Sequence, residues 1–206
     1  MPLIDEFYYE NAKIGIWHIT EANEFFEKKY KPIKSISHPK NKVLHAAAWY
    51  TALELAKPLV IVPAYLQHGA PADDKNNIKI SLSHTYIYAA ACIHNYRHVG
   101  IDIEMINSKA IIVKEKFANN VDVKTLATLN FNNNAHAYSL LWSIKEAAYK
   151  CMHIKGVTFK TSMSLIAAVK ITAFNFKITL KWNNKILYGE AKSVADMWVT
   201  YFLAPL

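Results

Sequence analysis

The chain has 206 residues and a formal net charge of +8, with 24 lysine and arginine residues against 16 aspartate and glutamate residues. Its apolar content of 52% excludes intrinsic disorder, and its two cysteines exclude a disulfide framework or a cysteine-based zinc site. No apolar run approaches the roughly 18 to 20 residues of a membrane span, and the N-terminal stretch MPLIDEFYYENAK is acidic where a signal peptide is basic. We therefore expect a cytoplasmic globular protein with no membrane partner.

The N-terminal half predicts strands and two helices. Apolar residues at helical spacing predict a helix over Asn41–Leu55, and a shorter helix is expected over Glu21–Tyr30 with Thr20 as its cap. Strand composition marks four segments: Ile14–Ile19, Leu59–Leu66, Ile78–His84 and Thr85–His94. A proline interrupts the second segment, which predicts that this strand lies at the edge of its sheet.

The C-terminal half also contains helices followed by strands. A strand is predicted over Val99–Ile106, and helical material follows in three segments: Lys109–Asn120, Val121–Asn130 and Ala135–Met152. The stretch Thr161–Leu203 predicts strands with a turn at Asn183–Asn184. The two halves are therefore compatible with two related α+β lobes that meet near residues 96–99.

Two carboxylates lie on one face of the strand predicted in VGIDIE. Residues i and i+2 of a strand point the same way, so Asp102 and Glu104 lie side by side, with Ile101 and Ile103 buried behind them. Acids that face the same way repel each other unless a cation lies between them, and Mg²⁺ is usually held by one or two carboxylates plus substrate phosphates. The alternative interpretation is an exposed polar strand face.

The long helix carries a second polar pair in WSIKEAAYK. Glu146 and Lys150 are four residues apart and share a helix face, which by itself indicates a surface ion pair. Beside Asp102 and Glu104, however, Glu146 can serve as a third metal ligand or as a base, and Lys150 and Lys145 can bind phosphate.

A third group of polar residues ends a strand in SLSHT. His84 lies 18 residues before Asp102, and a hydroxyl and an imidazole at a strand end can bind an anion. A Ser-His-Asp nucleophile is disfavoured, because Ser83 and His84 are adjacent and point to opposite faces of the strand. The sequence contains no glycine-rich phosphate-binding loop.

Taken in this order, SLSHT, VGIDIE and WSIKEAAYK resemble the signature of the Sfp-type 4′-phosphopantetheinyl transferases. Asp102 and Glu146 are 44 residues apart, a spacing similar to that of the family. The resemblance implies an α+β fold of two similar α/β lobes related by a pseudo-twofold axis, here residues 1–97 and 98–206. It places the active site in the cleft between the lobes, with the metal and catalytic motifs in the C-terminal lobe.

The resemblance also implies the reaction. The family transfers 4′-phosphopantetheine from coenzyme A to a serine of an acyl, peptidyl or polyketide carrier protein and releases adenosine 3′,5′-bisphosphate. Asp102, Glu104 and Glu146 would hold Mg²⁺ against the pyrophosphate; Glu146 would also help to deprotonate the carrier serine, and Lys150 would assist catalysis at the phosphates. The expected coenzyme A contacts are Lys42, Ser83, His84, Asp102, Glu146 and Lys150.

Two positions depart from the family pattern. Gly69–Pro71 reads Gly-Ala-Pro where the family has Gly-Lys-Pro near the adenine. The first long helix has no arginine to meet the 3′-phosphate, and Trp49 stands near that place. Lys40, Lys42 or His45 can compensate, and a weaker or altered binding of coenzyme A is expected at this end.

The positive charge by itself is compatible with other partners. Nucleic acid is disfavoured because Arg97 is the only arginine, and arginine is the usual reader of guanine edges. The carrier proteins of the family are typically acidic, which explains the charge without nucleic acid. We expect a monomer, since both lobes lie in one chain. The alternative function is that of a non-catalytic relative that binds a carrier protein or a nucleotide without transfer.

Overall fold

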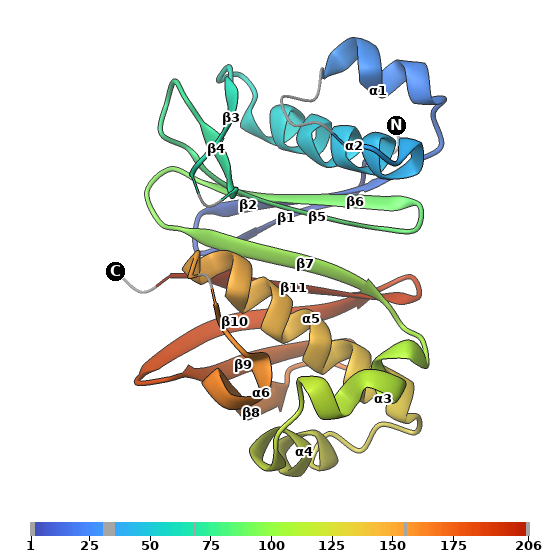
Figure 1. Ribbon diagram of the computed structural model, residues 1–206, viewed down its shortest axis with the longest axis vertical. Coiled ribbons are helices and arrows are strands. Elements are labelled where there is room, and N and C mark those ends of the chain that lie inside the picture. Colours follow the sequence, from blue (N-terminus) through green and yellow to red (C-terminus); the bar gives the residue numbers. More distant parts are fainter. Residues whose placement is uncertain (1–2, 31–35, 68, 155, 205–206) are drawn as a thin grey trace.

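A computed structural model describes residues 3–30, 36–67, 69–154 and 156–204, and it contains two antiparallel sheets, each covered by helices (Figure 1). This arrangement confirms the predicted α+β fold of two similar lobes. The last strand of the first sheet ends at His94 and the first strand of the second sheet begins at Val99. We propose on this basis that the lobes divide at residues 97 and 98, as the sequence predicts.

The N-terminal lobe is built on a six-stranded sheet of order β1-β2-β6-β5-β4-β3. Its strands are β1 (Leu3–Tyr9), β2 (Ala12–His18), β3 (Pro63–Tyr65), β4 (Pro71–Asp73), β5 (Lys79–Thr85) and β6 (Tyr88–His94). Its helices are α1 (Asn23–Lys29) and α2 (Pro39–Ala56). Helix α2 packs on β6, β5 and β2, and its alanine-rich stretch permits a close fit to the sheet.

The C-terminal lobe is built on a five-stranded sheet of order β7-β11-β10-β9-β8. Its strands are β7 (Val99–Met105), β8 (Met163–Lys170), β9 (Asn175–Trp182), β10 (Lys185–Val194) and β11 (Met197–Leu203). Its helices are α3 (Lys109–Val113), the 3₁₀ turn η1 (Lys114–Lys116), α4 (Asn120–Ala127), α5 (Asn134–Met152) and α6 (Phe159–Ser162). Helix α5 packs on β7 and β11.

The two lobes share one topology. In each lobe a first strand is followed by helices and then by four strands, and the last strand inserts beside the first. The order β2-β6-β5-β4-β3 in one sheet therefore matches β7-β11-β10-β9-β8 in the other, with α2 in the place of α5. Strand β1 is an addition at the edge of the first sheet. This correspondence accounts for the predicted pseudo-twofold relation.

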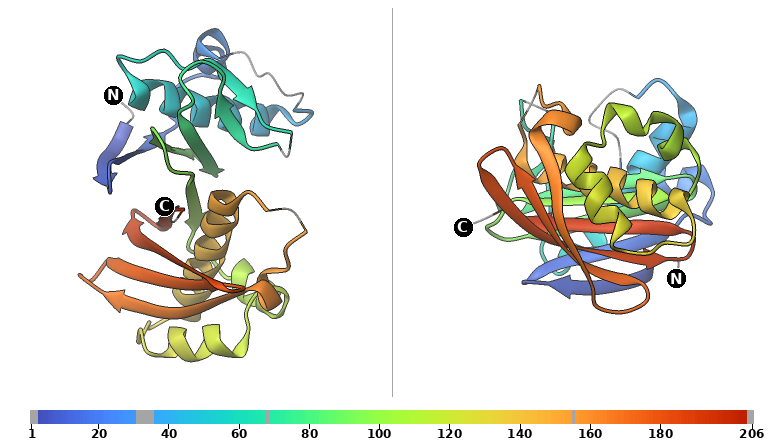
Figure 2. Two further views of the ribbon diagram at one scale, coloured as in Figure 1. Left: turned by 90° about the vertical axis from the view of Figure 1, so that its left-hand side faces the viewer. Right: turned by 90° about the horizontal axis from the view of Figure 1, so that it is seen from below.

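The two sheets pack against each other through their central strands. Apolar residues of β2 and β6 meet those of β7 and β11 in one core, so each of these strands is buried on both faces. Figure 1 shows β7 lying where the two lobes meet, and Figure 2 gives two further views of the same arrangement. Strand β7 is an edge strand, and its outer amide groups are satisfied from the N-terminal lobe: Ile101 donates to Ser81 Oγ and Ile103 donates to Ser83 Oγ.

Charged contacts add to this interface. Arg97, in the segment between the lobes, bonds Glu10 at 2.7 Å and the carbonyl of Ala204 at 2.8 Å. Lys192 of β10 reaches Asp5 of β1 at 2.6 Å. The single arginine therefore joins the two ends of the chain near the place where the lobes meet.

Most predicted elements are present, with three differences in the N-terminal lobe. Thr20 does not cap the first helix: α1 begins at Asn23 and its cap residue, Ala22, makes no side-chain bond. The strand predicted over Leu59–Leu66 is shorter than expected, because β3 begins only at Pro63, although it does lie at the sheet edge. Strands β1 and β4 were not predicted. No helix in the described part of the chain is both long and apolar enough to cross a membrane.

Candidate functional site

Strand β7 and helix α5 approach each other closely at Gly100. A Cβ atom at this position would lie 2.0 Å from the carbonyl oxygen of Ala147 and 2.5 Å from the backbone nitrogen of Cys151. Only a residue without a side chain permits this approach. Gly100 of VGIDIE thus sets the distance between the strand that bears Asp102 and the helix that bears Lys150.

Ser83, Asp102 and Lys150 form one hydrogen-bonded cluster. Lys150 Nζ donates to Asp102 Oδ1 at 2.8 Å, to Ser83 Oγ at 3.0 Å and to the carbonyl of Ile101 at 3.0 Å. Ser83 Oγ donates to Asp102 Oδ1 at 3.0 Å and accepts from the amide of Ile103 at 3.2 Å. The three motifs, which are separate in the sequence, therefore meet in one contact.

Glu104 and Glu146 lie close enough to Asp102 for the charges to interact. Burial and then the charge of Asp102 raise the pKa of Glu104 to about 7, with Glu146 adding to the rise and a hydrogen bond from Asn107 opposing it. Burial and then the charge of Asp102 also raise the pKa of Glu146, against the opposing effect of Lys150. Three acids that repel one another in this way favour a bound cation.

Asp102 also carries the atom that fits such a cation. Its Oδ2 oxygen is buried and has no hydrogen-bond partner among the described residues, which is costly for a carboxylate unless a positive charge lies beside it. Within the described ranges, no group of three or more His, Cys, Asp or Glu side chains could hold a metal ion. Mg²⁺ usually takes only one or two carboxylates and completes its shell with water and substrate phosphates, so these donors fit Mg²⁺ that binds together with a phosphate ligand.

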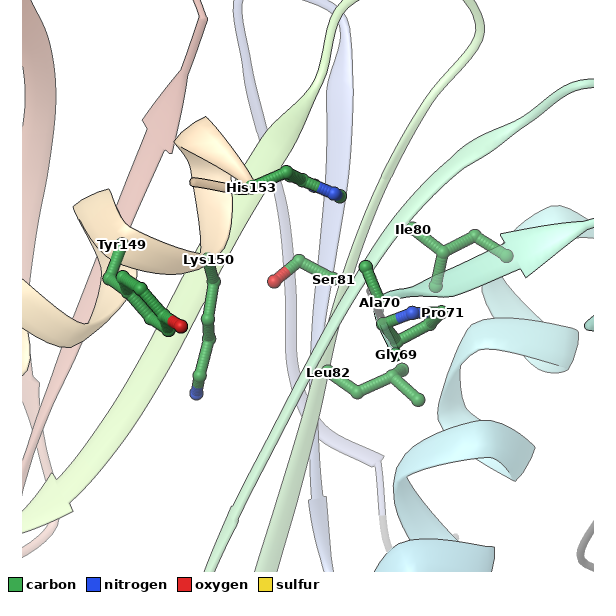
Figure 3. Close-up of a pocket in the computed structure, with 9 residues that line it drawn as sticks. All are labelled: Gly69, Ala70, Pro71, Ile80, Ser81, Leu82, Tyr149, Lys150 and His153. Carbon is green, nitrogen blue, oxygen red and sulfur yellow. The ribbon is translucent and has the colours of Figure 1, made fainter. Parts of the chain in front are cut away.

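A cavity of about 220 Å³ opens beside this cluster, between the two lobes (Figure 3). The N-terminal lobe lines it with Gly69–Pro71 and with Ile80, Ser81 and Leu82 of β5. The C-terminal lobe lines it with Tyr149, Lys150 and His153, at the end of α5. The segment Gly69–Pro71, which the family resemblance places near the coenzyme A adenine, therefore lies across the cavity from Lys150.

In the described part of the chain, His84 and Lys42 are not among the residues that line this cavity. His84 lies in β5 beside Ser83, and desolvation together with the charge of Lys150 lowers the pKa of its imidazole. Lys42 is half-buried in the first turn of α2. The expectation that these two side chains contact coenzyme A stays a prediction.

Lys145 has a structural role, so its interpretation as a phosphate contact is wrong. Its side chain is completely buried and forms an ion pair with Asp122 at 2.6 Å. The same ammonium donates to the carbonyls of Phe117 at 2.8 Å, Met163 at 3.0 Å and Phe159 at 3.2 Å. Burial lowers the pKa of Lys145 and Asp122 opposes this effect, so the ion pair joins α5 to α4 and β8.

Trp49 likewise belongs to the core. It is completely buried, its indole donates to the hydroxyl of Tyr65 at 2.7 Å, and its ring stacks on Tyr30. The same hydroxyl also contacts His45. Trp49 is therefore part of a hydrogen-bonded aromatic cluster in the N-terminal lobe and does not present a surface to phosphate.

Five residues that line the cavity were not predicted as site residues: Ile80, Ser81, Leu82, Tyr149 and His153. The three with polar side chains each had a positional signal. Ser81 lies two residues before Ser83 and so on the same face of β5. Tyr149 follows Glu146 by three residues and precedes Lys150, on the same side of α5, and His153 is the residue that ends this helix.

The fold and this site together define a two-lobed protein with a carboxylate and lysine cluster beside an interlobe cavity, the kind of site that phosphoryl transfer requires. Residues 98–195 match the family model of the 4′-phosphopantetheinyl transferase superfamily. Proteins of this superfamily use coenzyme A and act on carrier proteins. No curated protein matches the chain.

Proposed function

We propose that this protein is an Sfp-type 4′-phosphopantetheinyl transferase that depends on Mg²⁺. It would move 4′-phosphopantetheine from coenzyme A to a serine of an apo acyl, peptidyl or polyketide carrier protein and release adenosine 3′,5′-bisphosphate. The observation that carries the proposal is the contact of Ser83, Asp102 and Lys150, one residue from each motif, at the side of an interlobe cavity.

The cavity has the chemistry that coenzyme A requires. Apolar side chains of Ile80 and Leu82 line one wall and the ring of Tyr149 lies on the other, which suits the flat adenine and the pantetheine chain. Lys150 lies at the same cavity and can exchange one of its three bonds for a phosphate oxygen. His84 and Lys42 are further candidate contacts for the phosphates.

Asp102 would hold the metal ion together with the pyrophosphate. Glu104 and Glu146 would join as ligands once their side chains move towards it, since the described residues contain no ready group of three metal ligands. Mg²⁺ bound there would act as a Lewis acid that neutralises the charge of the pyrophosphate. Asp102 is held in place for this task because its Oδ1 atom bonds Ser83 and Lys150, which leaves the unpartnered Oδ2 atom for the ion. Burial and then the charge of Asp102 raise the pKa values of Glu104 and Glu146, and a cation bound beside them would oppose the effect of Asp102.

The reaction is an in-line displacement at phosphorus. The carrier serine oxygen forms a bond to the phosphorus that bears pantetheine, and the bond from that phosphorus to the oxygen bridging the two phosphates breaks. Glu146 would take the serine proton, a task that suits a carboxyl whose pKa is raised above its ordinary value. Lys150 would stabilise the charge that develops on the phosphate oxygens. The bridging oxygen leaves with adenosine 3′,5′-bisphosphate.

The net charge of +8 favours an acidic partner, which is the second part of the proposal. Exposed lysines of the C-terminal lobe, among them Lys109, Lys116 and Lys124, would attract the carrier protein. We propose that the enzyme acts as a monomer in the cytoplasm, since one chain supplies both walls of the cavity.

The test is incubation with a panel of apo carrier proteins, coenzyme A and Mg²⁺, followed by the intact mass of each carrier. We expect a phosphopantetheine adduct on at least one carrier and none without coenzyme A. If no carrier is modified, calorimetry with coenzyme A and with the carriers identifies the alternative. Binding of either without transfer would then indicate the non-catalytic relative and refute the enzyme.

A further inference from the structure

Two serines of β5 lie on the same face of the strand and make the same kind of contact. Ser81 and Ser83 are both buried, and each hydroxyl accepts a bond from an outer amide of β7: Ile101 at 3.0 Å for Ser81 and Ile103 at 3.2 Å for Ser83. Each serine therefore satisfies one outer amide of β7 at the joint between the lobes. Their remaining contacts differ.

The hydroxyl of Ser83 has no capacity left for a ligand. A serine hydroxyl has one hydrogen to donate and two lone pairs that accept. Ser83 donates to Asp102 Oδ1 at 3.0 Å, and its two lone pairs accept from the amide of Ile103 and from Lys150 Nζ. All of its hydrogen bonds are thus made inside the protein, where they hold Asp102 and Lys150 together.

The hydroxyl of Ser81 has capacity left, and it lies at the cavity. Within the described part of the chain, its one hydrogen bond is the one that it accepts from Ile101, which leaves its proton and one lone pair. Among the described residues, Ser81 lines the cavity and Ser83 does not. Figure 3 shows the Ser81 hydroxyl on the side of the strand that faces Lys150 and His153.

We propose that these serines have separate tasks: Ser81 is the hydroxyl that contacts coenzyme A, and Ser83 is a positioning residue for Asp102 and Lys150. This inference rests on the proposed function and differs from the expectation that Ser83 itself binds coenzyme A. Two residues of a strand span about 7 Å, so Ser81 lies one such step along β5 from the cluster around Asp102. It therefore donates to an oxygen of the nucleotide half of coenzyme A, beside the reacting phosphate rather than on it.

The two alanine variants are matched controls for each other. Ser81→Ala and Ser83→Ala each remove one acceptor for a β7 amide, and Ser83→Ala also removes the bonds to Asp102 and Lys150. Both are expected to lower the melting temperature, Ser83→Ala by more, so binding and turnover are compared per folded molecule. A difference between them in binding or in turnover then reports the separate tasks and not the shared structural one.

The first measurement is the affinity for adenosine 3′,5′-bisphosphate, the nucleotide half of coenzyme A, by calorimetry. Ser81→Ala is expected to weaken binding about tenfold, the effect of one lost hydrogen bond to a charged ligand. Ser83→Ala is expected to stay within about twofold of the wild type. Equal losses in both variants, or a larger loss in Ser83→Ala, would overturn the assignment.

The second measurement is steady-state transfer to an apo carrier across a range of pH. Ser81→Ala is expected to raise the KM for coenzyme A with little change in kcat. Ser83→Ala is expected to lower kcat about tenfold or more and to shift the pH profile, because the pair of Asp102 and Lys150 loses its shared partner. A pH profile for Ser83→Ala identical to that of the wild type would refute the positioning role. The affinity for the nucleotide is measured in the absence of transfer. If the wild-type protein transfers no phosphopantetheine, the proposed function is refuted, but the binding measurement still decides the role of Ser81.

Discussion

The close approach of β7 and α5 gives the sharpest test of how the fold builds the site. In the variant Gly100→Ala, the new methyl group would lie 2.0 Å from the carbonyl oxygen of Ala147 and 2.5 Å from the backbone nitrogen of Cys151. Both neighbours belong to the backbone of α5, so no flexible side chain can move aside. The helix itself must shift by roughly 1 Å or more to restore van der Waals contact.

This shift is transmitted directly to the site. Glu146 and Lys150 lie on the displaced part of α5, while Asp102 stays on β7, so the 2.8 Å contact between Lys150 and Asp102 is lost. Overpacking of this kind costs about 1–3 kcal/mol of stability, and a displacement of about 1 Å at a reacting centre can lower the rate about a hundredfold. We therefore expect Gly100→Ala to fold with a reduced melting temperature and to lose about two orders of magnitude in kcat/KM.

The assay is phosphopantetheine transfer per folded molecule, with the folded fraction measured by circular dichroism. Gly189→Ala is the matched control, because its methyl group would lie 2.4 Å from the carbonyl oxygen of Tyr201, in a strand pair that bears none of the proposed catalytic side chains. We expect a similar loss of stability with a much smaller loss of rate. Transfer by Gly100→Ala at the wild-type rate would refute the reasoning.

Two further predictions concern buried charge. Lys145→Met leaves the carboxylate of Asp122 buried without its counter-ion, so the free energy of unfolding in urea should fall by about 3–5 kcal/mol. The control Lys57→Met, at an exposed ion pair, should lower it by less than about 1 kcal/mol. Equal losses in the two variants would contradict the structural role of Lys145. The pKa of Glu104 is raised to about 7 from an ordinary value of 4.5, so the folded state binds its proton more tightly than the unfolded state does. The free energy of unfolding contributed by this group should therefore fall as pH rises from about 4.5 to 7 without divalent metal, and Glu104→Gln should reduce that fall; a variant that loses as much stability as the wild type over this range would contradict the raised pKa.

Local patterns predicted the elements that bury one continuous apolar face. The long helices were found because their apolar residues recur at helical spacing, and β5, β6 and β7 because their composition is that of buried strands. Strand β1 was missed because its residues alternate between half-buried and exposed positions at an edge, a weak signal. Thr20 failed as a cap because helix starts depend on the loop geometry before them, and α1 begins three residues later.

The contact of the three motifs could not be derived from local patterns, because it depends on the packing of the two lobes. The sequence places Asp102 and Glu104 on one strand face, but only the packing of β5 against the edge of β7 brings Ser83 to Asp102. The misinterpretation of Lys145 could have been avoided. It lies four residues after Leu141 and three before Ala148, on the buried stripe of α5, whereas Glu146 begins the stripe that faces the cavity.

The single arginine, Arg97, has a structural role in the fold, whereas composition alone would suggest a role in ligand binding. Arg97 lies between the lobes and bonds Glu10 and the carbonyl of Ala204, so its role is in the assembly of the fold. The positive charge available for ligands is therefore lysine, which binds phosphate as a point charge. This is consistent with a site in which Lys150 meets a pyrophosphate.

The central claim is that Asp102 links the metal, the lysine and the serine in one phosphoryl-transfer site. Its most direct test is transfer of phosphopantetheine to an apo carrier by Asp102→Ala, compared with Asp74→Ala, an exposed acid outside the site. We predict that Asp102→Ala stays folded and gives no carrier adduct by intact mass, while Asp74→Ala transfers at the wild-type rate. Undiminished transfer by folded Asp102→Ala would contradict the account.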